Sequence, residues 1–92
     1  MSAVAAHLIV RGVVQGVGFR YFVYRQAALL GLTGWTRNRP DGTVEIAAEG
    51  SRAQLEGLIK EVRVGPRSAR VSDVQVDWRE ATGNYQTFDI RG

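Results

Sequence analysis

The residues best suited to chemistry lie in one short stretch, Gly12-Val-Val-Gln-Gly-Val-Gly-Phe-Arg20. Its last two glycines stand between an apolar run typical of a strand and an apolar-periodic run typical of a helix. Successive main-chain N–H groups in such a turn can point into one concavity, and the first N–H groups of the following helix have no intrahelical partner. Arg20 adds a permanent charge and a planar set of donors that match phosphate oxygens. The stretch therefore predicts a loop that binds an anion.

The same glycines also have a purely structural interpretation, because turns between a strand and a helix use glycine for its backbone freedom. Spacing alone does not decide between this interpretation and anion binding. Two familiar phosphate loops are excluded. No Gly-Lys-Ser/Thr follows the glycines, and Tyr21 stands where a dinucleotide-binding fingerprint needs its third glycine.

The composition favours one folded domain over residues 1–92, with 45% hydrophobic and 23% charged residues. The absence of cysteine excludes disulfides, thiolate catalysis and cysteine-ligated metal sites. The formal net charge of +3 favours anionic partners, either small phosphates or nucleic acid. The N-terminal stretch is typical of a strand rather than a signal peptide, and no apolar run approaches the roughly 20 residues of a membrane helix. We therefore expect a cytoplasmic protein with no membrane partner.

The elements that must position the loop follow from hydrophobic periodicity and turn signals. Helices are predicted over 19–30, which Gly31 ends, and from the Ser51 cap to the residue before Gly65. Strands are predicted over 7–14, 33–38, 43–49, 69–79 and 85–90, and turns over 39–42 and 80–84. Strand 43–49 alternates, so we expect one apolar face and one largely solvated face. The order predicts an α+β, ferredoxin-like split β-α-β sandwich, with two helices on one face of a mainly antiparallel sheet and an extra C-terminal strand.

Four sequence blocks resemble the acylphosphatases. They are Gly12 to Arg20, Leu30-Gly-Leu-Thr-Gly-Trp-Thr-Arg-Asn38, Asp41-Gly-Thr-Val-Glu45 and Gly65-Pro-Arg-Ser-Ala-Arg-Val71. This resemblance implies the same ferredoxin-like fold and hydrolysis of small acyl phosphates to a carboxylate and inorganic phosphate, without metal or cofactor. It also implies that Arg20 and Asn38 are catalytic. The implied phosphate-binding loop consists of Gln15, Gly16, Val17, Gly18, Phe19 and Arg20. Thr36 departs from the pattern, which more often has an aliphatic residue there, and we expect it to affect packing or tuning.

The residues are consistent with this chemistry. The leaving carboxylate is a weak base with a pKa of roughly 4, so no general acid is needed. Loop amides and Arg20 would hold the phosphoryl group, and the Asn38 carboxamide would orient the attacking water. A protein base is missing from this pair. We therefore predict that an oxygen of the bound phosphate accepts the proton of the water. We also predict that inorganic phosphate, as the product, inhibits the reaction, and that the protein acts as a monomer.

Two other functions remain open. RNA-recognition modules share this fold, and Gly18 to Val23 faintly echoes their motif, but it leads into a helix, so we expect no nucleic-acid partner. The chain could also be an acylphosphatase-like domain that acts with a carbamoyl-transfer system for hydrogenase maturation. His7 is expected to be structural or solvent-facing, Trp35 and Trp78 to pack in the core or half-buried, and Arg37 and Arg39 to lie on the solvated surface.

Overall fold

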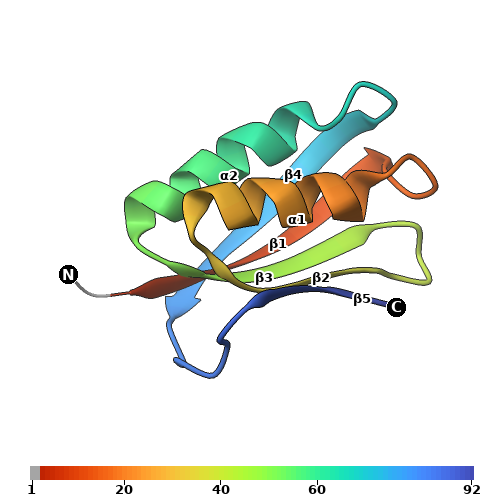
Figure 1. Ribbon diagram of the computed structural model, residues 1–92. Coiled ribbons are helices and arrows are strands. Elements are labelled where there is room, and N and C mark those ends of the chain that lie inside the picture. The colour runs from red at the N-terminus through yellow and green to blue at the C-terminus, as the bar shows by residue number, and fades with distance from the viewer. Residues whose placement is uncertain (1–2) are drawn as a thin grey trace.

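The structure is a computed structural model, which describes residues 3–92 (Figure 1). In chain order its elements are β1 (Val4–Val13), α1 (Phe19–Leu30), β2 (Thr33–Asn38), β3 (Val44–Gly50), α2 (Arg52–Val64), β4 (Arg70–Glu80) and β5 (Phe88–Arg91). The predicted bounds of α1, β2 and the end of α2 are confirmed.

The five strands form one sheet in the order β4-β1-β3-β2-β5. The pairs β1–β4, β1–β3 and β2–β3 are antiparallel, and β2–β5 is parallel. Both helices lie on the same face of this sheet (Figure 1). These features confirm the predicted ferredoxin-like α+β fold with an extra C-terminal strand. Because β1 and β2 both run antiparallel to the strand between them, β3, they are parallel to each other, and the loop after β1 and the end of β2 lie at the same end of the sheet.

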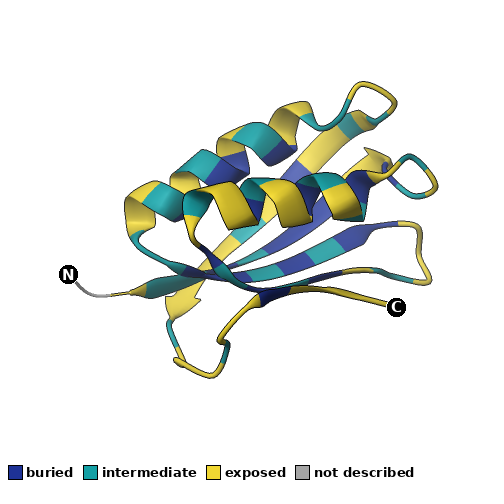
Figure 2. Cartoon of the chain, viewed as in Figure 1, coloured by how far each residue is buried: buried dark blue, intermediate teal, exposed yellow. Residues whose placement is uncertain are grey.

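The core lies between the two helices and the sheet, where dark-blue buried segments face one another (Figure 2). Four elements contribute the residues of an apolar stripe: Ala6, Leu8 and Val10 of β1, Val44, Ile46 and Ala48 of β3, Phe19, Val23 and Ala27 of α1, and Leu55, Leu58, Ile59 and Val62 of α2. Burial of the valine, leucine, isoleucine and phenylalanine side chains among these stabilises the fold by about 1.5–3 kcal/mol each. The core therefore fixes α1, and with it the loop that leads into this helix.

The helix ends follow local signals. Gly31 ends α1 in the left-handed conformation, at φ 71°, and its N–H donates to the carbonyl groups of Ala27 and Ala28. Ser51 and Gln54 form the predicted capping box at the start of α2. In contrast, no side chain caps α1, which begins directly after Gly18. The N-terminal end of α1, which no side chain caps, is thus the end that faces the predicted loop.

Two strands differ from the prediction in their length. β1 begins at Val4 because this residue already pairs with Gly50 of β3 and Glu80 of β4. β5 covers only Phe88–Arg91, so Tyr85 falls in the connection that precedes it. In both cases the pairing partner, rather than the local apolar pattern, determines where the strand begins.

The outer face of the predicted strand 43–49 was expected to be largely solvated, and this is wrong: Glu45 and Ala47 are only partly exposed, and the other two residues of this face are buried. Thr43 and Glu49 are each only 7% exposed. Thr43 is held by Asp41 in the preceding turn, and Glu49 lies under the connection between β4 and β5, where it accepts hydrogen bonds from Thr82 and Gly83. Loops outside the sheet cover these positions, so strand alternation could not reveal their burial.

Candidate active site

A hollow of about 190 Å³ lies between the β1–α1 loop and the end of β2. It is lined by Val14, Gly16, Gly18, Phe19, Arg20, Tyr21, Asn38 and Ile90. Its volume is below the roughly 300–1,000 Å³ of sites that enclose drug-sized ligands. The structure therefore places Arg20 and Asn38, which belong to different elements, at one small opening.

The loop amides are arranged by two glycines with left-handed backbone, Gly16 at φ 73° and Gly18 at φ 76°. Such angles are costly for other residues, by about 1–2 kcal/mol. The first hydrogen bond into α1 runs from the Phe22 N–H to the Gly18 carbonyl oxygen at 3.1 Å, so earlier N–H groups lack an intrahelical partner. No acidic residue lies in the first turn of α1. This helix terminus thus keeps its partial positive charge for an anion.

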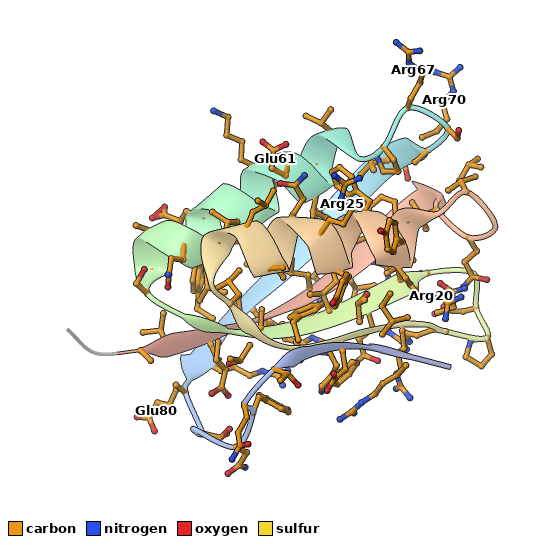
Figure 3. All side chains as sticks on the ribbon, in the orientation of Figure 1. Arg20, Arg25, Glu61, Arg67, Arg70 and Glu80 are labelled. Atoms are coloured by element: carbon orange, nitrogen blue, oxygen red, sulfur yellow. The ribbon has the colours of Figure 1, made fainter. Side chains whose placement is uncertain are left out.

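Arg20 brings the formal positive charge to the hollow. Its Nη1 donates to the carbonyl oxygen of Arg91 in β5 at 2.9 Å. No ion pair joins Arg20 to a carboxylate within residues 3–92. In Figure 3 its side chain extends from α1 towards the C-terminal strand. Since a guanidinium has five N–H donors, the contact with Arg91 orients the side chain and leaves donors for a ligand.

Asn38 is the last residue of β2 and pairs with Val44 of β3. The predicted 39–42 turn closes behind it, with the Arg39 N–H donating to the Thr43 carbonyl oxygen at 2.9 Å. Asp41 accepts from the Thr43 hydroxyl at 2.6 Å and from the Thr43 N–H at 3.0 Å. The hydroxyl and then the N–H of Thr43 hold the pKa of Asp41 below its ordinary value. A rigid turn therefore presents Asn38 to the hollow.

Gln15 has a role that sequence reasoning missed. Its Nε2 donates to the carbonyl oxygens of Arg39 at 2.7 Å and Thr43 at 2.8 Å. The side chain thus ties the β1–α1 loop to the turn that carries Asn38. Gln15 and Val17, both predicted in the phosphate-binding loop, do not line the hollow, whereas Gly16, Gly18, Phe19 and Arg20 do. Because Gln15 binds main-chain oxygens, no partner side chain in the sequence signalled this contact.

Thr36 lies in the core rather than at the hollow. It is fully buried, and its hydroxyl donates to the Glu45 carbonyl oxygen at 3.0 Å. Its polar group is therefore satisfied within the sheet, which agrees with the expected effect on packing.

His7 lies with Glu45 and Arg37 across three strands. Glu45 contacts His7 Nε2 and Arg37 Nε, each at 2.6 Å. Burial raises the pKa of Glu45, but the hydrogen bonds and charges of His7 and Arg37 outweigh it and hold this pKa below its ordinary value. The structural role expected for His7 is confirmed by this contact.

The two tryptophans do not lie in the hydrophobic core. The Trp35 ring is half-buried, and the guanidinium groups of Arg91 and Arg37 lie 4.6 Å and 5.6 Å from its centre. Trp78 is 36% exposed and lies beneath Arg52 at 4.1 Å. Phe19, in the segment that echoes an RNA-binding motif, is 2% exposed and belongs to the core. The Phe19 ring is therefore not exposed and cannot stack on a nucleic-acid base.

Another part of the described structure is also hollowed, but the predicted site residues do not lie there. A larger hollow of about 570 Å³ lies between α2 and β4, and none of the predicted site residues lines it. Within residues 3–92, no cluster of three acidic or histidine side chains could hold a metal ion. None of the helices in this range is long and apolar enough to cross a membrane.

The structure is a ferredoxin-like α+β fold with a small hollow between a glycine loop and the end of a strand. The family model described as acylphosphatase matches residues 6–90. An acylphosphatase from Moorella thermoacetica is 52% identical over 99% of this chain and 97% of that protein. The chain therefore belongs to the acylphosphatase family, whose members are hydrolases that act on small acyl phosphates.

Solved structures agree with this assignment. The crystal structure of acylphosphatase from Bacillus subtilis has a TM-score of 0.93 and 39% identity, and the match covers 97% of this chain and 99% of that one. The crystal structure of HypF from T. kodakarensis has a TM-score of 0.84 and 33% identity, over 97% of this chain and 12% of that one. The same fold thus occurs both in acylphosphatases of similar length and within a much longer chain.

Proposed function

We propose that the hollow between the β1–α1 loop and β2 is the catalytic site for acyl phosphate hydrolysis. The single observation that carries this proposal is that Gly16, Gly18, Arg20 and Asn38 line one hollow. The loop amides and Arg20 hold the phosphoryl oxygens, on which charge is spread in the transition state. Asn38 holds the attacking water with its carboxamide, which offers both an acceptor and donors.

The reaction then balances without a protein base. The water oxygen forms a bond to phosphorus, and the bond from phosphorus to the acyl oxygen breaks with its electron pair on that oxygen. The departing carboxylate, with a pKa of roughly 4, needs no proton. The proton of the water passes to an oxygen of the phosphoryl group. No carboxylate or histidine is among the residues that line the hollow, which supports this route.

The proposal includes inorganic phosphate as a product that inhibits, because the loop that holds the phosphoryl group also fits free phosphate. We also propose that the protein is a monomer and needs no metal, because groups of this chain can carry out both tasks, holding the phosphoryl oxygens and holding the water. Sedimentation or light scattering measures the mass of the protein in solution and so tests whether it is a monomer. The cytoplasmic location expected from the sequence is part of the same proposal.

The deciding experiment is hydrolysis of benzoyl phosphate by the purified protein in the presence of a chelator, beside Arg20→Ala and Asn38→Ala. We expect wild-type turnover in the chelator, loss of activity by about 10³- to 10⁵-fold for Arg20→Ala, and retained folding by circular dichroism in both variants. Arg79→Gln, which removes an exposed arginine near the end of β4, is the matched control. Full activity of a folded Arg20→Ala variant would contradict the proposed site.

A second candidate is supported by the similarity to HypF, in which a matching fold occupies 12% of the chain. Under this alternative, the chain would act on carbamoyl phosphate with a larger partner. Comparing kcat/KM for carbamoyl phosphate and benzoyl phosphate separates the two. A marked preference for carbamoyl phosphate would favour the second candidate, and equal or lower activity on it favours the first.

A further inference from the structure

A second hollow, of about 320 Å³, lies beside the proposed catalytic site. It is lined by Gly18, Tyr21, Phe22, Arg25, Gln26 and Pro66. Gly18 and Tyr21 line both hollows, so the two share a wall. The second hollow therefore extends from the phosphate loop along α1 to the turn after α2.

The geometry of in-line displacement indicates that this hollow is the place of the acyl group. In an in-line displacement, the attacking water and the leaving oxygen lie on opposite sides of phosphorus. Asn38, which is proposed to hold the water, lines the first hollow and not the second. With the phosphoryl group at the loop, the acyl group must extend away from Asn38. Gly18 has no side chain in the way, and a Cβ at this position would meet nothing within 4 Å.

The walls of the second hollow have two kinds of chemistry. Tyr21 is 59% exposed and, with Phe22 and Pro66, offers apolar surface to a hydrocarbon or aromatic stem. Arg25 and Gln26 add a guanidinium and an amide, both donors to an anion. The Arg25 guanidinium lies 5.9 Å from the centre of the Tyr21 ring. The polar and apolar walls are therefore next to each other.

The Arg25 charge is available for a ligand. No ion pair joins Arg25 to an acidic side chain within residues 3–92. In Figure 3, Arg25 extends from the side of α1 that faces α2, and Arg20 from the other side. The two arginines thus serve different hollows, one at each side of the shared wall.

We infer that the second hollow is an acyl-group subsite that favours acyl phosphates with a distal anionic group, held by Arg25 and Gln26. The inference rests on the proposed function, because it takes the position of the phosphoryl group from it. The distal anion is a carboxylate or a phosphate-like group on a short apolar stem. Arg25 is a specificity-determining residue and takes no part in the chemical step.

The test compares aromatic acyl phosphates that differ only at the far end of the ring. Benzoyl phosphate has no distal charge, the 3- and 4-carboxybenzoyl phosphates carry a carboxylate, and 4-phosphonobenzoyl phosphate carries a phosphonate. Each is assayed with wild type, Arg25→Gln, Arg25→Lys and Arg79→Gln. Arg79 is exposed and lines neither hollow, so its variant controls for the loss of one positive charge.

For Arg25→Gln we expect kcat/KM to fall by about fivefold for at least one anionic substrate, which is the size of effect of an exposed ion pair. The loss should appear in KM, with kcat unchanged, because the contact is present in substrate and transition state alike. Benzoyl phosphate should be unaffected, and Arg25→Lys should recover part of the loss. Whether the carboxylate or the phosphonate substrate responds more identifies the preferred anion.

An equal loss for benzoyl phosphate and the anionic substrates, or the same loss in Arg79→Gln, would overturn the subsite, because either result indicates general attraction of anions. So would unchanged kinetics in Arg25→Gln. This failure is distinguishable from that of the proposed function, which fails only if wild type does not hydrolyse benzoyl phosphate or if Arg20→Ala retains full activity.

Discussion

The Arg20 guanidinium donates a hydrogen bond from Nη1 to the main-chain carbonyl oxygen of Arg91, at 2.9 Å. The two residues are 71 positions apart, and β5 brings them together by its parallel pairing with β2. The side chain of Arg91 points to a different partner, the Trp35 ring, at 4.6 Å. The C-terminal strand therefore acts on Arg20 through a main-chain atom.

Removal of Arg91 and Gly92 should lower kcat/KM for benzoyl phosphate by roughly tenfold to a hundredfold. The physical reason is that Arg20 loses the acceptor that orients it, and misplacement by about 1 Å can cost 10²-fold. Arg91→Ala keeps the carbonyl group and is the matched control, with activity expected near that of wild type. Equal losses in the truncated chain and in Arg91→Ala would show that the side chain, not the carbonyl group, matters.

Arg20→Lys and Asn38→Ala should separate phosphate binding from turnover. Arg20→Lys should weaken inhibition by phosphate and also lower kcat, because a point charge does not replace the planar set of guanidinium donors. Asn38→Ala should lower kcat by about 10²-fold while phosphate inhibition stays near that of wild type, because only the water loses its partner. Steady-state kinetics with phosphate as inhibitor provides both values. A normal kcat in Asn38→Ala would remove Asn38 from the mechanism.

Gln15→Leu should lower activity through the position of Asn38. Gln15 binds the carbonyl oxygens of Arg39 and Thr43, at 2.7 and 2.8 Å, and so sets the distance between loop and turn. Loss of these hydrogen bonds should also lower the free energy of unfolding by about 1–3 kcal/mol. A double-mutant cycle with Asn38→Ala is the measurement. If Gln15 acts by positioning Asn38, its loss costs much less activity in the Asn38→Ala background.

The control for this prediction is Gln75→Leu, since Gln75 is an exposed glutamine of β4 whose hydrogen bond to Arg11 is long, at 3.4 Å. Additive losses from Gln15→Leu and Asn38→Ala would instead indicate that Gln15 only stabilises the fold.

The parts of the fold that sequence could predict are those with local causes. The bounds of α1 follow from helical spacing that begins at Phe19 and from Gly31, and those of β2 from the turn after Asn38. The early start of β1 and the short β5 depend on strand partners distant in the chain, which local periodicity does not contain. The burial of Glu49 depends on a loop that crosses the sheet.

The candidate site also has features that the sequence could reveal and features that it could not. Arg20 could be identified from the glycine loop, and Asn38 only through a resemblance to known proteins, since a lone asparagine at a strand end has many uses. The contacts that position them, from Gln15 and to Arg91, involve main-chain oxygens. Because every residue has a carbonyl group, such contacts leave no residue type to recognise in a sequence.

Glu49→Gln should destabilise the protein at neutral pH and change how its stability depends on acid. Glu49 accepts hydrogen bonds from the Thr82 hydroxyl at 2.8 Å and from the N–H groups of Thr82 and Gly83, each at 3.0 Å. Burial raises the pKa of Glu49, but these hydrogen bonds outweigh it and hold the pKa below the ordinary value of 4.5. The carboxylate therefore contributes stability above that value, and the contribution is lost as pH falls through the folded-state pKa.

At neutral pH we expect the free energy of unfolding of Glu49→Gln to be lower by about 1–3 kcal/mol, since hydrogen bonds to charged groups are the stronger ones. As pH falls below the ordinary value, wild type should lose this advantage and the two denaturation curves should converge. Glu56→Gln is the control, because Glu56 is exposed and its contact with Arg52 is long, at 3.8 Å, so the loss should be about 0–1 kcal/mol. Urea denaturation across this pH range is the measurement, and a constant difference between wild type and Glu49→Gln at every pH would contradict the role of the charged form.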